Sequence, residues 1–209
     1  MITTYHATTF GPKEIGAKLM PITHFGDPRI GLTQAYRNID FWRKSGRTCE
    51  KIYIYKVELE SDRPLGMNDT HASNAQALLY HIRTDVEDGK KIVTDEDWKD
   101  FKRKEFVLTS GYSGDEIETL PGRKRAAEII LSRGFDVISY ENENKSEIRG
   151  IEIFSDYLSG QISVTDHPDL NAKTCYINLK EVEPKLVLET KTAEIDKICK
   201  EKGFDVNGS

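Results

Sequence analysis

Two short segments at opposite ends of the sequence carry the residues best suited to chemistry. Residues 4–9 place His6 among β-branched and aromatic residues near the start of the chain. Residues 135–142 contain Tyr140 and Asn142 and lead into an acidic stretch. A carboxylate beside a ribose can bind a hydroxyl group and stabilise the positive charge that develops as a glycosidic bond breaks. A histidine on another strand can hold a second hydroxyl group, so the two segments predict glycosidic-bond chemistry if they meet in space.

Each candidate segment also has a purely structural interpretation. His6 can be a hydrogen-bonded histidine at the edge of the core. Residues 24–27, followed by Tyr36 about two helical turns on, can be a turn, a helix cap and a core aromatic residue. The acidic stretch can be a solvated hairpin with scattered carboxylates. Single short motifs often match by chance, but the three segments together are more specific than any one of them.

The composition indicates a soluble chain with one sizeable core. Of the 209 residues, 37% are hydrophobic and 31% are charged, and the net charge is -5. A mildly acidic chain is not drawn to nucleic acid by its overall field, although a local basic patch can still bind phosphates. The three cysteines are widely spaced and fit neither a metal site nor a disulfide framework. They are typical of a reducing cytosol, and we expect a cytoplasmic protein without a bound metal.

The first residues carry no basic region and no apolar run, so we expect no signal peptide. No stretch approaches the ~20 apolar residues of a membrane span, so no membrane partner is expected.

The pattern of the first third predicts alternating strands and helices. Residues 2–8 and 51–60 are rich in β-branched and aromatic residues and predict strands. A short helix is expected from Pro12, and residues 22–25 predict a short extended piece. Asp27 can cap a long helix that has Pro28 at its first position.

The rest of the chain predicts a helical insertion followed by strands. Residues 68–104 are expected to be mostly helical, with Thr94 and Asp97 in a capping-box-like arrangement. A loop is expected at residues 111–114. Residues 120–134 predict another helix that ends at a glycine. Strands are expected at 135–140, 148–154, 161–165, 175–179 and 185–188, and a final helix at 193–202. We predict one α+β domain over residues 1–209, with a helical insertion at about 68–133 and a C-terminal extension at about 181–209.

Taken in order, the three segments resemble the ADP-ribosyltransferase superfamily. The likeness is to the histidine–tyrosine–glutamate branch that includes diphtheria toxin, and to small phage and bacterial transferases. Residues 5–8 are similar to the tyrosine–histidine–glycine–threonine signature, with Ala7 in place of the glycine. Residues 24–27 and 34–36 resemble the turn and helix that bear the nicotinamide-stacking tyrosine, here Tyr36. Residues 134–142 resemble a glycine–aromatic–aspartate run that ends in tyrosine–any–asparagine.

The resemblance leaves the catalytic glutamate open. Lys145 stands at the expected offset, and the candidates are Glu143, Glu147 and Glu152. We favour Glu147, because it stands at the start of the expected 148–154 strand and would share a face with its apolar residues. Glu152 has the opposite parity unless a bulge at Gly150 reverses it.

The resemblance implies a split antiparallel β-sheet core and an enzyme that uses NAD as its substrate. In that site Glu147 stabilises the cleaving ribose, and His6 binds a ribose hydroxyl group with Thr8 nearby. Tyr36 and Phe25 sandwich the nicotinamide ring, although Phe25 lacks the hydroxyl group of some relatives. Tyr140 and Asn142 complete the expected NAD site. No metal ion is needed.

The implied activity is mono-ADP-ribosyl transfer from NAD to a macromolecular acceptor, either a protein or a nucleic acid. The resemblance also implies a toxin, effector or phage-conflict role. Two alternatives remain open: an NAD glycohydrolase on the same fold, and a catalytically inactive binding module. Basic and aromatic residues interleave over residues 98–104, and residues 123–125 are basic. These two segments can recognise the acceptor or can simply be solvated helix faces.

Overall fold

The computed structural model describes residues 1–44, 46, 48–69, 74–83, 86–87, 90–103, 107–109, 116–118, 120–162 and 172–206. These residues form a mixed α+β fold with seven helices, two larger sheets and two two-stranded sheets. The loop expected at residues 111–114 and the second half of the strand expected at 161–165 lie outside the described residues.

The first larger sheet has three antiparallel strands in the order β1–β3–β11. Their bounds are Ile2–Thr8, Lys51–Leu59 and Lys185–Lys191. Strand β3 is buried on much of both faces, as its near-continuous apolar and aromatic sequence predicts. The predicted C-terminal extension therefore supplies the third strand of this sheet. Helix α7 (Thr192–Glu201) follows β11 directly and packs against it.

The second larger sheet has four strands in the order β2–β10–β9–β4. Their bounds are His24–Phe25, Thr174–Asn178, Val137–Glu141 and Pro64–Met67. The prediction of an antiparallel core is wrong for one pair, because β4 and β9 run parallel. The carboxylate of Asp136 accepts hydrogen bonds from the backbone N–H groups of Asp62 and Arg63, at 2.5 and 2.8 Å. Those bonds join the starts of β4 and β9, as a parallel pair requires.

The two sheets are joined at a seam between β1 and the end of β2. The backbone N–H of Tyr5 donates to the carbonyl of Gly26, and the N–H of Gly26 donates back to the carbonyl of Tyr5, both at 3.0 Å. The Thr4 hydroxyl donates to the same Gly26 carbonyl at 3.2 Å. A Cβ atom at Gly26 would lie 2.9 Å from Sγ of the buried Cys175, so the seam requires glycine at this position.

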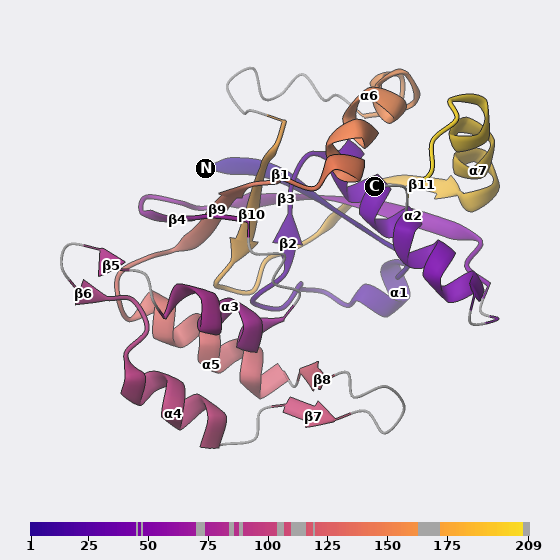
Figure 1. Ribbon diagram of the computed structural model, residues 1–209. Coiled ribbons are helices and arrows are strands. Elements are labelled where there is room, and N and C mark those ends of the chain that lie inside the picture. The colour runs from indigo at the N-terminus through magenta and orange to yellow at the C-terminus, as the bar shows by residue number, and fades with distance from the viewer. Residues whose placement is uncertain are drawn as a thin grey trace.

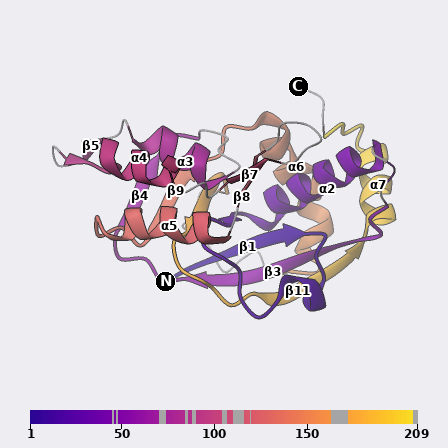
Figure 2. The same cartoon turned by 90° about the horizontal axis from the view of Figure 1, so that it is seen from below.

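Helices cover the sheets in two groups that lie on opposite sides of the molecule (Figure 1; Figure 2). Helix α2 (Pro28–Lys44) packs against β1 and against α6 (Lys145–Ser159), and α7 completes this group. Their apolar side chains share one core cluster with β1 and β3. A Cβ atom at Gly31 of α2 would lie 3.2 Å from Cβ of Ala7, so Gly31 makes room for the alanine methyl group on β1.

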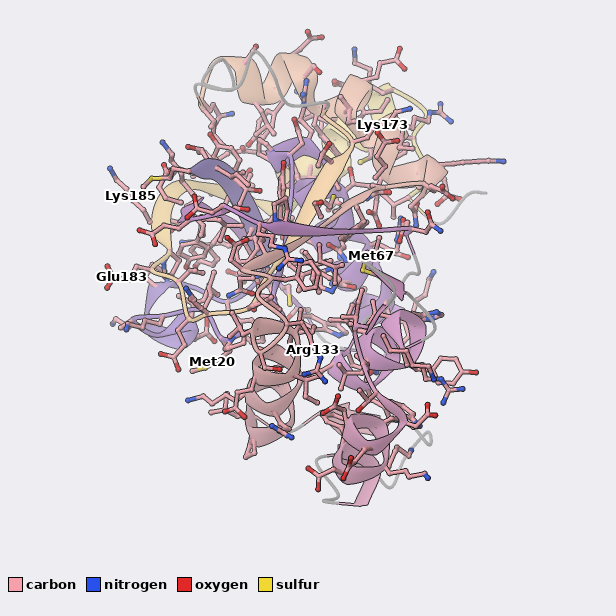
Figure 3. The ribbon with its side chains drawn as sticks, turned by 90° about the vertical axis from the view of Figure 1, so that its left-hand side faces the viewer. Met20, Met67, Arg133, Lys173, Glu183 and Lys185 are labelled. Atoms are coloured by element: carbon pink, nitrogen blue, oxygen red, sulfur yellow. The ribbon has the colours of Figure 1, made fainter. Side chains whose placement is uncertain are left out.

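The insertion forms the second group. Its helices are α3 (Ala75–Ile82), α4 (Asp95–Arg103) and α5 (Leu120–Leu131), and its short strands are β5 (Val86–Glu87), β6 (Lys90–Lys91), β7 (Val107–Thr109) and β8 (Glu116–Glu118). The helices share a separate core cluster with one face of the second sheet. Met67 and Arg133 lie on that side of the sheet (Figure 3). Thr94 and Asp97 form the predicted reciprocal cap at the start of α4.

The prediction of a strand at residues 148–154 is wrong, because these residues belong to helix α6. Asn144 caps this helix, and its side chain accepts from the N–H groups of Ser146 and Glu147. The buried residues of α6 follow a helical spacing, namely Glu147, Gly150, Ile153, Phe154 and Leu158. The isoleucines by themselves favour a strand. The Asn144 cap and the helical spacing of the buried residues favour a helix instead. Residues 161 and 162 form a turn rather than the predicted extended piece.

The close packing at the seam predicts that a methyl group added at Gly26 destabilises the protein. Gly26→Ala should lower the free energy of unfolding by about 1–3 kcal/mol, because the new Cβ overlaps Cys175 Sγ. The combined variant with Cys175→Ala should recover part of that loss, because the nearest remaining side-chain atom is 3.9 Å away. Urea unfolding measures both effects. Gly66→Ala is the matched control, since a Cβ there meets nothing within 4 Å; equal losses at Gly26 and Gly66 would contradict the account.

Candidate functional site

A cleft of about 490 Å³ opens at the end of β1, beside the seam between the sheets. Its walls come from four places in the sequence: the end of β1, the connection from helix α1 (Pro12–Ile15) to β2, one face of α2, and the start of α5. The polar and charged lining residues most relevant to binding are His6, Thr8, Lys18, Gln34, Asn38 and Arg123.

One face of α2 supplies a continuous wall. Gln34, Asn38 and Trp42 follow a four-residue spacing and therefore lie on the same side of the helix. Trp42 and Phe10 give the cleft two aromatic rings, and the Phe10 side chain is 52% exposed. The spacing of the α2 residues is visible in the sequence, but only the packing of α2 on β1 decides which face becomes the wall.

His6 is fixed in one tautomer at the base of the cleft. Its Nδ1 lies 3.0 Å from the backbone carbonyl oxygen of His24. A carbonyl oxygen only accepts hydrogen bonds, so Nδ1 carries the proton and Nε2 is left as an acceptor. Burial lowers the pKa of His6, and the nearby positive charge of Arg123 lowers it further, against the opposing effect of the His24 carbonyl. His6 is therefore a neutral hydrogen-bond acceptor at neutral pH.

The charge of the cleft suits an anionic ligand. Lys18 lines it from the connection between α1 and β2, and Arg123 lines it from the start of α5. None of the described residues that line it is an aspartate or a glutamate. An ammonium and a guanidinium group in one cavity are suited to bind phosphate oxygens.

The connection before β2 is held in an unusual conformation. Ile22 has a φ of 60° and is 3% exposed, and it lines the cleft. The left-handed region is unfavourable for a β-branched residue, at a cost of about 1–3 kcal/mol. The Ile22 N–H donates to the carbonyl of Asn178 at 2.9 Å, and the Thr23 N–H donates to the Asn178 side chain at 2.8 Å. These bonds hold the cleft wall against β10.

Phe25 supports His6 rather than lining the cleft. The Phe25 side chain is 3% exposed, and its ring meets the His6 ring edge-on with the centroids 5.8 Å apart. It belongs to a core cluster with apolar residues of β3, β9 and β10.

Tyr36 lies on the side of α2 that faces away from the wall formed by Gln34 and Asn38. Its hydroxyl group donates to Oδ1 of Asp196 at 2.5 Å, and Arg43 binds both oxygens of the same carboxylate. Burial and the Asp196 carboxylate raise the pKa of Tyr36 well above its usual value. The structure therefore does not bring Tyr36 together with His6. Two residues along a helix correspond to a rotation of about 200°, so Gln34 and Tyr36 cannot share a face.

Glu147 is buried in a polar cluster at the start of α6. It is 7% exposed, whereas Glu143 and Glu152 are exposed. Its Oε1 accepts from Nη1 of Arg37 at 2.9 Å, and its Oε2 accepts from the Asn142 amide at 2.6 Å. Asn142 and Glu147, both predicted as site residues, are thus brought together. Arg37 of α2 is the partner that the sequence did not indicate.

Tyr140 connects the second sheet to the cleft. Its hydroxyl group lies 3.0 Å from Nδ1 of His24, the residue whose carbonyl binds His6. Burial is the main cause of its raised pKa. The neighbouring thiol of Cys175 also has its pKa raised, to about 12, mainly by burial. Tyr140 therefore acts as a neutral hydrogen-bonding group behind the cleft wall.

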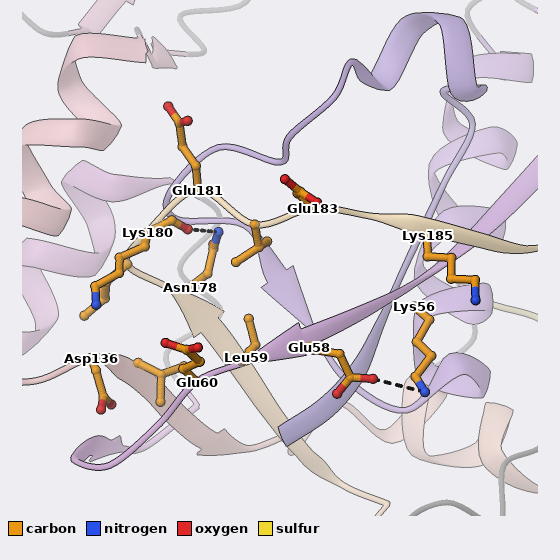
Figure 4. Close-up of a pocket in the computed structure, with 13 residues that line it drawn as sticks. Lys56, Glu58, Leu59, Glu60, Asp136, Asn178, Lys180, Glu181, Glu183 and Lys185 are labelled. Atoms are coloured by element: carbon orange, nitrogen blue, oxygen red, sulfur yellow. Dashed lines mark hydrogen bonds and ion pairs between the residues drawn. The ribbon is translucent and has the colours of Figure 1, made fainter. Parts of the chain in front are cut away.

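A second cleft, of about 610 Å³, lies where the connection between β10 and β11 crosses the end of β3 (Figure 4). Its charged side chains are engaged or exposed. Lys56 pairs with Glu58 at 3.0 Å, and the Asp136 carboxylate holds backbone amides. No histidine or aromatic ring is among its described lining residues. We therefore place the candidate site in the His6 cleft.

Comparison of the chain with protein-family models, curated proteins and solved structures finds no significant match. The described residues contain no group of three histidine, cysteine, aspartate or glutamate side chains that could hold a metal ion. No helix in the described part of the chain has the length and apolarity needed to span a membrane.

The lowered pKa of His6 predicts a pH-dependent stability. The unfolded chain takes up a proton on this histidine near pH ~6.5, whereas the folded protein resists protonation to lower pH. The contribution of His6 is therefore present above about pH 6.5 and is lost as the pH falls below it. Urea unfolding should be measured at about pH 7.5 and pH 5.5. Between these two pH values, the free energy of unfolding should fall less for His6→Gln than for the wild type. An identical loss in both proteins would contradict this assignment.

The Glu147 cluster predicts a stability effect that must be separated from catalysis. Glu147→Ala leaves Arg37 and Asn142 without their partner and should cost about 2–3 kcal/mol, near the lower end for a broken buried ion pair because Arg37 is partly exposed. Glu152→Ala, an exposed position on the same helix, should change stability by less than about 0.5 kcal/mol. Urea unfolding measures both values. A Glu147→Ala loss no larger than that of Glu152→Ala would refute the structural role of the cluster.

Proposed function

We propose that the chain is an NAD-dependent mono-ADP-ribosyltransferase whose dinucleotide site is the His6 cleft. The observation that carries the proposal is the fixed, neutral His6 at the base of a cleft lined by Lys18 and Arg123. The two sheets joined at the Tyr5–Gly26 seam are consistent with the split core that the sequence resemblance implies.

The size and charge of the cleft support a dinucleotide ligand. Its volume of about 490 Å³ falls within the range of about 300–1,000 Å³ that is typical of small-molecule sites. NAD carries a pyrophosphate between two ribose groups. Lys18 and Arg123 are placed to neutralise the pyrophosphate, while Thr8, Gln34 and Asn38 offer hydrogen-bonding groups for the riboses.

We propose that Trp42 and Phe10, rather than the Tyr36 and Phe25 indicated by the resemblance, stack on the rings of the dinucleotide. Tyr36 is held by Asp196 on another face of α2, and Phe25 is buried behind His6. Trp42 and Phe10 line the cleft and can stack on the nicotinamide or the adenine ring. We assign ring stacking to these two residues.

In the proposed reaction the bond between ribose C1′ and the nicotinamide nitrogen breaks, and the bonding electron pair leaves with nicotinamide. A nucleophilic atom of the acceptor forms a bond to C1′ and loses its proton to solvent water. His6 Nε2 accepts a hydrogen bond from a ribose hydroxyl group and holds the sugar in position. That hydrogen bond and the enclosing walls align C1′ with the acceptor.

Glu147 is proposed to act as a positioning residue. Its carboxylate holds Arg37, which lies one helical turn from the wall residue Gln34, and it holds Asn142, two residues beyond Tyr140. In this arrangement Glu147 fixes α2 against the end of β9.

A specific observation favours a second candidate, in which the chain binds NAD without cleaving it. Cleavage through an oxocarbenium-like state benefits from a carboxylate beside the ribose, and the described lining of the cleft contains none. In this candidate the same contacts hold the dinucleotide, and C1′ keeps its nicotinamide.

Incubation with NAD labelled on its adenylate half, in a cell lysate, tests the transferase proposal. We expect a labelled macromolecule. His6→Ala should reduce labelling at least about a hundredfold, the lower end of the effect of losing one well-placed catalytic hydrogen bond. Glu152→Ala, at an exposed position of α6 that does not line the cleft, should leave labelling unchanged. Labelling that is equal in wild type and His6→Ala would contradict the proposal.

The same reagents separate the candidates. Release of nicotinamide without any labelled macromolecule would indicate a glycohydrolase. A rise in Tm with NAD, without nicotinamide release, would indicate the binding module, since a ligand stabilises the state that binds it. No change in Tm at saturating NAD would exclude the His6 cleft as an NAD site. Arg123→Ala should weaken the NAD-dependent rise in Tm.

A further inference from the structure

The insertion carries a cluster of aromatic rings and cations on its surface. Tyr80 of α3 is 50% exposed, and its ring lies 5.9 Å from that of Trp98 on α4. The guanidinium carbon of Arg83 lies 4.3 Å from the Tyr80 ring centre and 5.5 Å from that of Trp98. Nζ of Lys102 lies 5.9 Å from the Trp98 ring. We call these four residues the Tyr80 cluster.

Among the described residues, the acidic residues of α4 do not pair with the cations of the Tyr80 cluster. Three of them form ion pairs with cations of neighbouring segments: Asp95 with Lys91 at 3.1 Å, Asp97 with Arg133 at 2.7 Å, and Asp100 with Arg125 at 3.5 Å. Arg83 and Lys102 form no ion pair with any residue in the described part of the chain. Positive charge therefore remains beside the exposed Tyr80 ring and the partly buried Trp98 ring, although the chain as a whole has a net charge of -5.

The ion pairs also orient the cluster relative to the cleft. Asp97 pairs with Arg133, beyond the end of α5, and Asp100 pairs with Arg125, near its start. Helices α4 and α5 are therefore antiparallel along this contact. Lys102 lies toward the same end of the insertion as Arg123, which lines the His6 cleft. A linear ligand bound to the Tyr80 cluster can thus extend toward the cleft along the start of α5.

We propose that the Tyr80 cluster binds single-stranded nucleic acid and presents it to the cleft as the acceptor. Aromatic rings stack on bases of any sequence, and adjacent cations bind the phosphates. A duplex keeps its bases stacked on one another and offers no free base for Tyr80. The identification of the strand as acceptor rests on the proposed transferase function, but the binding itself does not.

Fluorescence anisotropy with labelled oligothymidylate and oligouridylate of about 12 nucleotides tests the binding without NAD. We expect saturable binding that weakens with added salt. Tyr80→Ala should weaken it about tenfold, within the effect of losing one base stack, whereas Tyr80→Phe should retain it. Arg83→Gln should reduce the slope of log affinity against log salt by about 0.7, as expected for one lost phosphate contact. The two oligonucleotides distinguish DNA from RNA as the bound strand.

Phe41→Ala is the matched control, because Phe41 is 69% exposed on α2, outside the insertion. It should bind as the wild type does. Equal weakening by Phe41→Ala and Tyr80→Ala, equally tight binding of a duplex of the same sequence, or the absence of salt-dependent binding would each overturn the proposal. Unchanged urea unfolding of Tyr80→Ala confirms that a loss of affinity comes from the surface.

A final arm separates this inference from the proposed function. Labelled NAD is added to the wild-type protein with the bound oligonucleotide. Label on the oligonucleotide that falls with Tyr80→Ala supports both. Label on lysate proteins but not on the oligonucleotide overturns the acceptor assignment and leaves the transferase proposal intact. Oligonucleotide binding without any labelling keeps the surface as a binding site and counts against the transferase.

Discussion

The backbone pairing of Tyr5 with Gly26 is the constraint on which the rest of the structure depends. It joins two sheets through two reciprocal hydrogen bonds of 3.0 Å. It also places His24, two residues before Gly26, so that its carbonyl oxygen accepts from His6, the next residue after Tyr5. The close approach is possible because Gly26 has no Cβ to meet the Cys175 sulfur. One pair of residues therefore fixes both the sheet arrangement and the tautomer of the candidate catalytic histidine.

The chemistry proposed for the cleft follows from that constraint. His6 is neutral because burial and the nearby charge of Arg123 lower its pKa, against the opposing effect of the hydrogen bond that Nδ1 donates to the His24 carbonyl. In the proposed complex, an anionic dinucleotide meets two cations, the His6 acceptor and the polar side chains of Thr8, Gln34 and Asn38 in the same cavity. The Glu147 carboxylate is held by Arg37 of α2 and by Asn142, and it is not among the described residues that line the cleft. In the proposed site, the Glu147 carboxylate therefore has a structural role. The contacts with the substrate come from residues of β1, α2 and α5.

Local patterns in the sequence predict much of the fold and only part of the site. Strand β1 has its predicted bounds, and Asp27-Pro28 begins the long helix as its capping pattern indicates. The strand expected at residues 148–154 fails because isoleucine-rich segments suit both states until the Asn144 cap and the buried spacing are considered. The parallel position of β4 depends on Asp136, more than 70 residues away, which no local pattern contains. The role expected for Tyr36 depended on which face of α2 meets β1, a property of tertiary packing.

The most direct test of the account is an NMR titration of the histidine side chains with NAD. Free His6 should have its proton on Nδ1, and its Nε2 resonance should shift saturably as a hydroxyl group of NAD donates a hydrogen bond to Nε2. The exposed His81 resonances should stay unchanged. A His6 imidazole with its proton on Nε2, or one that does not respond to saturating NAD, would contradict the central claim.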